Sequence, residues 1–195
     1  MSKPRFVLAS KSPRRSELLE NLGIDFDVKV SGADEGGIPK TLPPHIYVQE
    51  LAVLKGTAVA ADCRRGNFVI AADTVVVCDG EIVGKPKDWD DAYRMLKMLS
   101  GKEHFVYTGF SVTDASNMMT VSGYEMTEVH FKELSETEIE EYLTSGEPFD
   151  KAGGYGIQGK ASLFVDSIKG DFFNVVGLPL CALNNLLIKE FNISL

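Results

Sequence analysis

The chain has 195 residues, 44% hydrophobic and 25% charged, which is the composition of an ordinary globular protein with a sizeable core. Its formal net charge of −8 argues against a broad nucleic-acid surface, although a small polyanion can still bind where cations gather. Because no secretory or membrane-spanning segment is evident and three cysteines lack metal-binding spacing, we expect a cytoplasmic protein with reduced thiols, as one domain over residues 1–195 or two small lobes sharing a sheet.

The first two predicted elements are a strand and a helix joined by a short polar turn. The apolar run Phe6–Ala9 predicts a buried strand, and Ser12 and Pro13 suit the N-cap and first position of a helix. Arg14 and Arg15 follow in the first turn. Together with free backbone N–H groups, they suit an anion, most naturally a phosphate. A solvated basic turn explains the same residues, and this segment alone does not decide between the two.

The rest of the chain alternates strand and helix patterns. Asp79-Gly80 indicates a tight hairpin, Ser135 and Glu138 indicate a capping box, and residues 162–168 and 172–176 predict a second hairpin. Because hairpins and crossover helices both occur, we predict an α/β protein with a mixed sheet. The other predicted strands are residues 26–30, 68–72, 75–78, 81–83, 105–112 and 119–131, and the other helices are residues 45–61, 90–99, 135–144 and 180–191.

Three charged residues stand where catalysis or anion binding is plausible. Asp73 follows the strand 68–72, and the end of a buried strand is a favoured place for a catalytic acid, base or metal ligand. By itself it equally fits an aspartate that caps a turn. Lys85 lies between a glycine and a proline that fix its backbone, which suggests an ammonium aimed at a ligand. Lys55 lies in a largely apolar helix, where it also fits a lysine that extends to solvent.

A glycine-rich segment lies in the last third of the chain. Residues 150–159 contain four glycines, which permit close backbone approach to a ligand. Gln158 offers both a hydrogen-bond donor and an acceptor, as reading a nucleobase edge requires. A flexible glycine loop is the competing hypothesis.

Six motifs resemble one known family. In chain order they are Leu-Ala-Ser-x-Ser-Pro-Arg-Arg, Ala-Asp-Thr-Val, Asp-Gly-Glu-x-x-Gly-Lys-Pro, Leu-Ser-Gly-x-x-His, Asp-Lys-Ala-Gly-x-Tyr-Gly-Ile-Gln-Gly and Val-Val-Gly-Leu-Pro. From Arg5 to about Leu187, the chain resembles the Maf family of nucleoside triphosphate pyrophosphatases, historically called septum formation proteins. The motifs are long, ordered and mutually independent.

The resemblance implies a fold and a reaction. The fold is like that of the inosine triphosphate pyrophosphatases, an elongated mixed sheet with flanking helices in two lobes around a nucleotide-binding cleft. The reaction is hydrolysis between the α- and β-phosphates, which gives a nucleoside monophosphate and pyrophosphate. A divalent cation, Mg²⁺ or Mn²⁺, and a homodimer are also implied, with no nucleic-acid or membrane partner.

Roles for individual residues follow from the same resemblance. Asp73 matches the catalytic carboxylate, either as general base on the attacking water or as metal ligand. Glu35 matches an acidic position that helps hold the metal, with Asp34 as the neighbouring candidate. The glycines after Glu35 depart from the commoner family sequence, which leaves that loop's geometry open. The phosphate-contacting positions are Ser10, Arg14, Arg15, Lys55 and Lys85.

Three positions, Arg14, Thr74 and Gln158, resemble the subgroup that acts on dTTP and UTP. The subgroup acting on 7-methyl-GTP tends to carry an aromatic residue at the first position and an acid at the third. A neutral amide can accept from uracil N3–H and donate to O4, so modified pyrimidines with the same edge should also be accepted. The alternatives are a purine-directed pyrophosphatase of the ITP or 7-methyl-GTP type and a non-catalytic nucleotide sensor linked to arrest of cell division.

Overall fold

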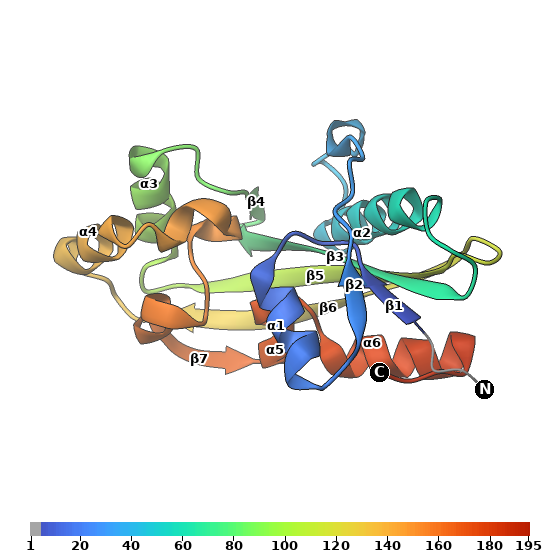
Figure 1. The fold of residues 1–195 in the computed structure, drawn as a ribbon. Helices are drawn as coiled ribbons and strands as arrows, with labels where there is room; N and C mark the ends of the chain where they lie inside the picture. Colours follow the sequence, from blue (N-terminus) through green and yellow to red (C-terminus); the bar gives the residue numbers. More distant parts are fainter. Residues whose placement is uncertain (1–4) are drawn as a thin grey trace. The chain divides into compact units, whose positions relative to one another are not determined.

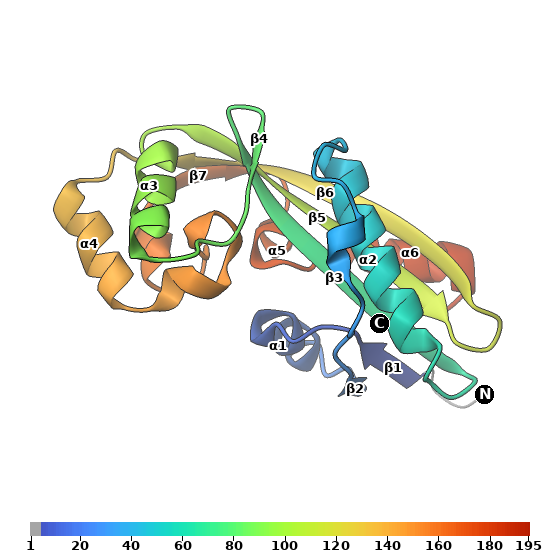
Figure 2. The same cartoon turned by 90° about the horizontal axis from the view of Figure 1, so that it is seen from above.

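A computed structural model describes residues 5–195, which form a mixed β-sheet with flanking helices (Figures 1 and 2). The chain divides into two compact units. Unit 1 comprises Met1–Asp73, Thr108–Glu125 and Gly177–Leu195, and unit 2 comprises Thr74–Tyr107 and Met126–Val176. The predicted α/β class with a mixed sheet is confirmed.

The sheet has seven strands in the order β2-β1-β3-β5-β6-β7, with β4 paired to β3. Strand β1 is parallel to β2 and β3, whereas the pairs β3–β4 and β6–β7 are antiparallel. The strands are β1 (Arg5–Leu8), β2 (Phe26–Val28), β3 (Asn67–Cys78), β4 (Glu81–Val83), β5 (Glu103–Asp114), β6 (Met119–Phe131) and β7 (Val165–Lys169).

Six α-helices and several shorter turns accompany these strands in the described residues. The helices are α1 (Pro13–Asn21), α2 (Pro44–Ala60), α3 (Trp89–Leu99), α4 (Glu136–Thr144), α5 (Phe172–Val176) and α6 (Leu180–Leu186), the last continued by a π-helical turn at Leu187–Phe191. The 3₁₀ segments are Glu35–Gly37, Glu147–Asp150, Ala152–Gly154 and Gly159–Leu163. Within residues 5–195, every helix is too short or too polar to cross a membrane.

The core of unit 1 is layered on the two faces of its strands. Alternate residues of a strand point to opposite faces. One set packs against the C-terminal half of α2 in a cluster of Val7, Ala9, Val59, Ala60, Val69 and Ala71. On the other face, Phe68 meets Phe191 edge-on with ring centroids 5.5 Å apart. Helices α2 and α6 therefore cover opposite faces of these strands (Figure 1).

Helix α2 lies unusually close to strand β5. A Cβ atom at Gly109 would stand 2.3 Å from the Val48 carbonyl carbon, and one at Gly56 would stand 2.8 Å from Ser111 Oγ. The buried Ser111 hydroxyl also donates a hydrogen bond of 2.8 Å to the Ala52 carbonyl. Backbone therefore contacts backbone, which fixes the height and register of α2 on the sheet.

The core of unit 2 is aromatic and contains one buried histidine. His104 Nε2 lies 2.7 Å from the Tyr155 hydroxyl, and neither side chain is appreciably exposed. The Phe131 ring lies edge-on to both, with centroids 4.9 Å from His104 and 4.7 Å from Tyr155. Burial lowers the pKa of His104 to about 4, so the imidazole is neutral at physiological pH.

The two strands predicted for the second hairpin differ from the structure. Residues 172–176 form helix α5 rather than a strand, because Asp171 Oδ1 accepts from the Phe173 N–H at 2.8 Å at its start. The buried Asn174 amide then bonds the Val106 carbonyl and Thr127 Oγ1, at 3.0 and 2.9 Å. The predicted strand 162–168 is confirmed over residues 165–168, where β7 lies, whereas the 3₁₀ segment Gly159–Leu163 takes its first residues.

Asp73 is also placed differently from the prediction. It lies inside a continuous strand, because β3 runs without interruption from Asn67 to Cys78. The Asp79-Gly80 hairpin is confirmed, with both residues at positive φ, 52° and 82°. The capping box at Ser135 and Glu138 is confirmed as well.

Substitution of Gly109 by alanine tests the contact between α2 and β5. We expect Gly109→Ala to lower the free energy of unfolding by about 3 kcal/mol, because the added methyl group overlaps the α2 backbone. Urea denaturation measures this. The control is Gly32→Ala, where a Cβ meets no atom within 4 Å and the change should stay within about 0.5 kcal/mol. Equal effects of the two substitutions would contradict the argument.

The buried histidine predicts a pH dependence of stability. Its folded pKa of about 4 lies below the ordinary 6.5, so the unfolded chain binds more protons between these values. Stability is therefore full above pH 6.5 and is lost as the pH falls toward 4. We expect the wild type to lose up to about 3 kcal/mol more than a His104→Gln variant across this window. Urea denaturation at a series of pH values measures this. An equal pH dependence of the free energy of unfolding in the two proteins would refute the prediction.

Candidate active site

Three predicted charged residues meet in unit 1. Lys55 Nζ on helix α2 lies 2.6 Å from Asp73 Oδ1 on strand β3 and 3.2 Å from Glu35 Oε1. The Lys55 and Asp73 side chains are only 14% and 18% exposed, whereas Glu35 is 52% exposed. The hypothesis that Lys55 merely extends to solvent is therefore wrong. Among the described residues, no hydrogen bond to Asp73 Oδ2 is formed.

Local sequence explains how these three residues meet. Small residues where α2 crosses the sheet, Gly56 against Ala71 and Ser111, let the helix approach and carry Lys55 to the strand. Glu35 begins a 3₁₀ turn in which Asp34 Oδ1 accepts from the Gly36 N–H at 2.9 Å. The two neighbouring acids therefore have different roles: Asp34 caps the turn, and Glu35 forms an ion pair with Lys55.

Hydrogen bonds to Ser10, in the turn before α1, and to Gly177 hold the side chain of Arg15. Arg15 Nε donates to the Gly177 carbonyl at 2.7 Å, and its Nη1 donates to Ser10 Oγ at 3.1 Å. Ser10 is buried and also accepts from the Ser12 N–H at 3.1 Å. Ser12 occupies the predicted N-cap position, but its side chain makes no capping bond. The first-turn N–H groups of α1 therefore carry no N-cap oxygen, as an anion site requires.

Electrostatics link the arginine turn to the ion pair. Burial lowers the pKa of Arg15, the negative charge of Asp73 opposes this shift, and the positive charge of Arg14 adds to it. The negative charge of Asp73 therefore interacts with both Arg15 and Lys55. Besides Glu35, five predicted site residues lie in unit 1 and form one charged neighbourhood there. They are Ser10, Arg14, Arg15, Lys55 and Asp73.

The sequence analysis did not identify Tyr47, which lies on the buried face of helix α2. Its ring is buried, and burial together with the charges of Asp73 and Glu35 raises the pKa of the phenol. The hydroxyl therefore stays protonated and can donate near the two carboxylates. Its position two helical turns before Lys55, on an otherwise apolar face, was the available signal. Gly177, whose carbonyl holds Arg15, lay inside a quoted motif without an assigned role.

Unit 2 holds the other predicted residues. Lys85 and Gln158 are exposed and Thr74 is partly buried. The segments that carry Lys85 and Gln158 are joined, because the Gly153 N–H donates to the Gly84 carbonyl at 2.9 Å. Among the described residues, none forms a hydrogen bond or ion pair with the Lys85 side chain, so its ammonium is available to a ligand.

The glycines of residues 150–159 serve protein packing. A Cβ at Gly153 would stand 2.9 Å from Val76 Cγ2, and one at Gly156 would stand 2.9 Å from the alkyl chain of Lys151. At Gly159 it would stand 2.9 Å from Glu147 Oε2. The hypothesis of a flexible glycine loop is therefore not supported, and the close approach that the glycines permit is to the protein itself.

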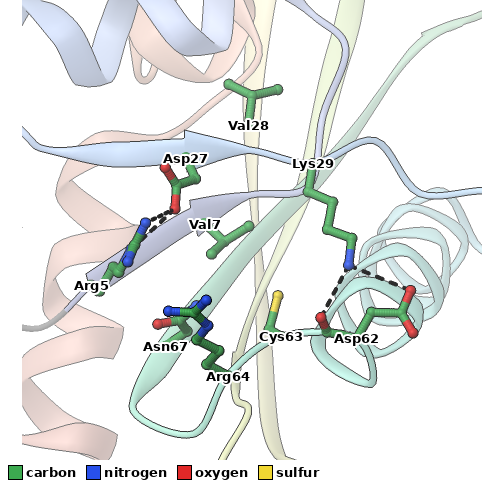
Figure 3. Close-up of a pocket in the computed structure, with 9 residues that line it drawn as sticks. All are labelled: Arg5, Val7, Asp27, Val28, Lys29, Asp62, Cys63, Arg64 and Asn67. Carbon is green, nitrogen blue, oxygen red and sulfur yellow. Dashed lines mark hydrogen bonds and ion pairs between the residues drawn. The ribbon is translucent and has the colours of Figure 1, made fainter.

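Unit 1 also contains an open pocket of about 320 Å³, which is lined by other residues than those of the candidate site (Figure 3). Four of its charged residues form ion pairs with one another, Arg5 with Asp27 and Lys29 with Asp62. None of the predicted site residues lines it. The remaining lining residues are Val7, Val28, Cys63, Arg64 and Asn67.

The donor set suits a hard divalent cation only in part. Asp73 and Glu35 direct oxygens to one point, now held by the Lys55 ammonium. Within residues 5–195, no cluster of three or more metal-binding side chains occurs. Two carboxylates nevertheless match Mg²⁺, which commonly takes one or two carboxylates and completes its shell with water and substrate phosphates.

The chain is similar to proteins of one known family. A family model described as "Maf-like protein" matches residues 5–190. A dTTP/UTP pyrophosphatase of Alkaliphilus metalliredigens is 50% identical over 191 residues, 98% of each chain. Proteins of the same name from Thermoanaerobacter sp. and Clostridioides difficile are 47% and 49% identical, covering 98% and 97% of this chain and 99% and 96% of the relatives.

Two solved structures align with about two thirds of this chain. The Ham1 protein of Staphylococcus aureus aligns with 65% of this chain and 71% of its own, at a TM-score of 0.45 and 17% identity. A HAM1 protein from Coxiella burnetii gives a TM-score of 0.44 at 16% identity over 65% of this chain and 72% of that one.

The two hydrogen bonds of Arg15 yield a prediction for stability. We expect Arg15→Lys to lower the free energy of unfolding by about 1–2 kcal/mol, because one ammonium cannot reach both Gly177 O and Ser10 Oγ in the fork geometry of a guanidinium. Thermal and urea denaturation measure the loss. Arg5→Lys, at an exposed ion pair with Asp27, is the control and should change stability by less than about 0.5 kcal/mol. A larger loss in the control than in Arg15→Lys would show that the anchoring is unimportant.

Proposed function

The chain belongs to the Maf family, and on this premise we propose that it is a nucleoside triphosphate pyrophosphatase that hydrolyses dTTP and UTP to the monophosphate and pyrophosphate. Relatives of that name, about half identical over nearly the full length, support the reaction and substrates. The observation in the structure that carries the proposal is the largely buried pair of Lys55 and Asp73, with one carboxylate oxygen left for water.

In this reaction we assign Asp73 the role of general base. Lys55 holds Oδ1, which orients the carboxylate and leaves Oδ2 to accept a proton from a water molecule. That water attacks the α-phosphorus, the bond from this phosphorus to the bridging oxygen breaks, and the electron pair leaves with pyrophosphate. The proton on Asp73 then returns to solvent or to the leaving group.

The cations serve the charge of the substrate and of the leaving group. Arg15 is fixed by the Gly177 carbonyl and Ser10 Oγ, and it follows Arg14 in the first turn of α1, where the Ser12 side chain makes no capping bond. Preorganised cations stabilise charge that develops on leaving oxygens, because they need no reorganisation during the reaction. Ser10, Lys55 and Lys85 complete the proposed phosphate-binding set. The cations that unit 1 gathers near Asp73 give a local positive cluster, which can attract a triphosphate to a chain of net charge −8.

A divalent cation, Mg²⁺ or Mn²⁺, is part of the proposal. Asp73 and Glu35 would hold it, since their oxygens already converge on one cationic atom. When bound, such an ion supplies Lewis-acid stabilisation of phosphate charge.

Base choice is assigned to Arg14, Thr74 and Gln158. The exposed Gln158 amide can accept from uracil N3–H and donate to O4, whereas a purine presents a different edge and size. We further propose a cytoplasmic homodimer without a nucleic-acid partner. A non-catalytic sensor would not require the buried base, and the names of the relatives do not support a purine-directed enzyme.

Pyrophosphate release from a panel of nucleotides tests the reaction. With Mg²⁺ or Mn²⁺, we expect strong release from dTTP and UTP, and a fall in kcat of about 10²–10⁴-fold in Asp73→Asn, which keeps the shape of the side chain but loses the base. Asp27→Asn, at a surface ion pair, is the matched control and should keep wild-type activity.

Other outcomes of this panel have defined meanings. Release mainly from ITP or GTP derivatives would keep the reaction and overturn the pyrimidine assignment. Tight nucleotide binding without turnover by the wild type would identify a sensor instead of an enzyme.

A further inference from the structure

We propose that the buried hydrogen bond between His104 and Tyr155 positions the base-reading residue Gln158. The pair thereby sets pyrimidine selectivity, and the inference rests on the proposed function above. Neither residue touches substrate in this proposal. Both act through the segment 151–159, so they are positioning residues.

The hydrogen bond ties the segment to the sheet of unit 2. His104 lies on strand β5, and its Nε2 is 2.7 Å from the Tyr155 hydroxyl. His104 is 0% exposed and Tyr155 is 5% exposed, and Phe131 of β6 closes against both rings. Burial keeps both groups neutral, because it lowers the pKa of His104 and raises that of Tyr155. The bond therefore persists across the neutral pH range.

The backbone transmits this anchor to Gln158. Tyr155 has extended torsions, φ −146° and ψ 159°, and Gln158 has φ −87° and ψ 162°. Tyr155 and Ile157 are both buried, whereas Gln158 is exposed. Because the chain is held at residues 155 and 157, the buried tyrosine fixes the backbone from which the Gln158 side chain extends.

Two further contacts leave the segment little freedom. The Gly153 N–H bonds the Gly84 carbonyl, and Gly153 is packed against Val76 of β3. Gly156 lies on the alkyl chain of Lys151, whose ammonium bonds Asp150 Oδ1 at 2.7 Å. These contacts fix the segment on either side of Tyr155. The hydroxyl of Tyr155 is the polar anchor between them.

Orientation of the amide matters because glutamine can pair with either pyrimidine. Rotated by half a turn, the same amide that accepts from uracil N3–H and donates to O4 would donate to cytosine N3 and accept from N4–H. Preference for uracil over cytosine therefore requires a fixed amide. Loosening the segment should weaken this preference more than it weakens turnover.

Selectivity in four variants tests the proposal. The ratio of kcat/KM for UTP to that for CTP is measured by pyrophosphate release in Tyr155→Phe, Gln158→Ala, the double variant and Tyr142→Phe. We expect Tyr155→Phe to lower the ratio at least fivefold while kcat for UTP changes less than threefold. In the double variant the ratio should match that of Gln158→Ala within twofold, because both changes act through one amide. Tyr142→Phe, a buried tyrosine on helix α4, should leave the ratio unchanged.

A readout without substrate separates this proposal from the proposed function. Hydrogen exchange of the nucleotide-free protein, followed by mass spectrometry, should show at least tenfold faster exchange over residues 150–159 in Tyr155→Phe than in Tyr142→Phe. His104→Gln is a second route to the same loss if Tyr155→Phe does not fold.

The proposal is overturned if Tyr155→Phe lowers both kcat/KM values equally, or if exchange over residues 150–159 is unchanged. A wild type that does not distinguish UTP from CTP would overturn the selectivity. If the wild type hydrolyses neither nucleotide, the proposed function is wrong, and the exchange measurement alone decides whether the pair positions the segment.

Discussion

The direct contact between helix α2 and strand β5 is the constraint on which unit 1 depends. Gly109 lets the α2 backbone touch the strand, and Gly56 and Ser111 repeat the contact two turns later. Because this contact sets the height of the helix, Lys55 reaches Asp73 across a distance of 2.6 Å. A looser helix would leave a lysine and an aspartate partly buried without each other, an arrangement with a large desolvation penalty.

Much of the fold follows from short-range rules that a sequence displays directly. The Asp79-Gly80 hairpin and the capping box at Ser135 were predicted because each depends on a few adjacent residues. Residues 172–176 were not, because a five-residue apolar run has no clear period and its helix is held by the distant partners of Asn174. Asp73 was expected at a strand end for a similar reason, since pairing of its neighbours extends β3 beyond it.

The sequence named the charged residues of the candidate site, whose catalytic roles stay a prediction, but it did not reveal how they are arranged. The motifs identified the charged residues, and unit 1 brings Ser10, Arg15, Lys55 and Asp73 into one neighbourhood. Tyr47 was missed because a buried aromatic residue on a helix is ordinarily core. The glycines of residues 150–159 had two compatible explanations, close approach to a ligand or to protein, and only the contacts of Val76 and Glu147 distinguish them.

The packed state of that glycine segment has a thermodynamic consequence for ligand binding. A loop that becomes ordered only on binding loses conformational entropy at that moment, which reduces affinity. Here Gly153, Gly156 and Gly159 are already held by protein contacts, so this entropy is lost during folding. Under the proposed function, a nucleotide that contacts Gln158 retains more of the free energy of its contacts. The heat capacity change of binding should then reflect the ligand's buried surface, with little contribution from loop ordering.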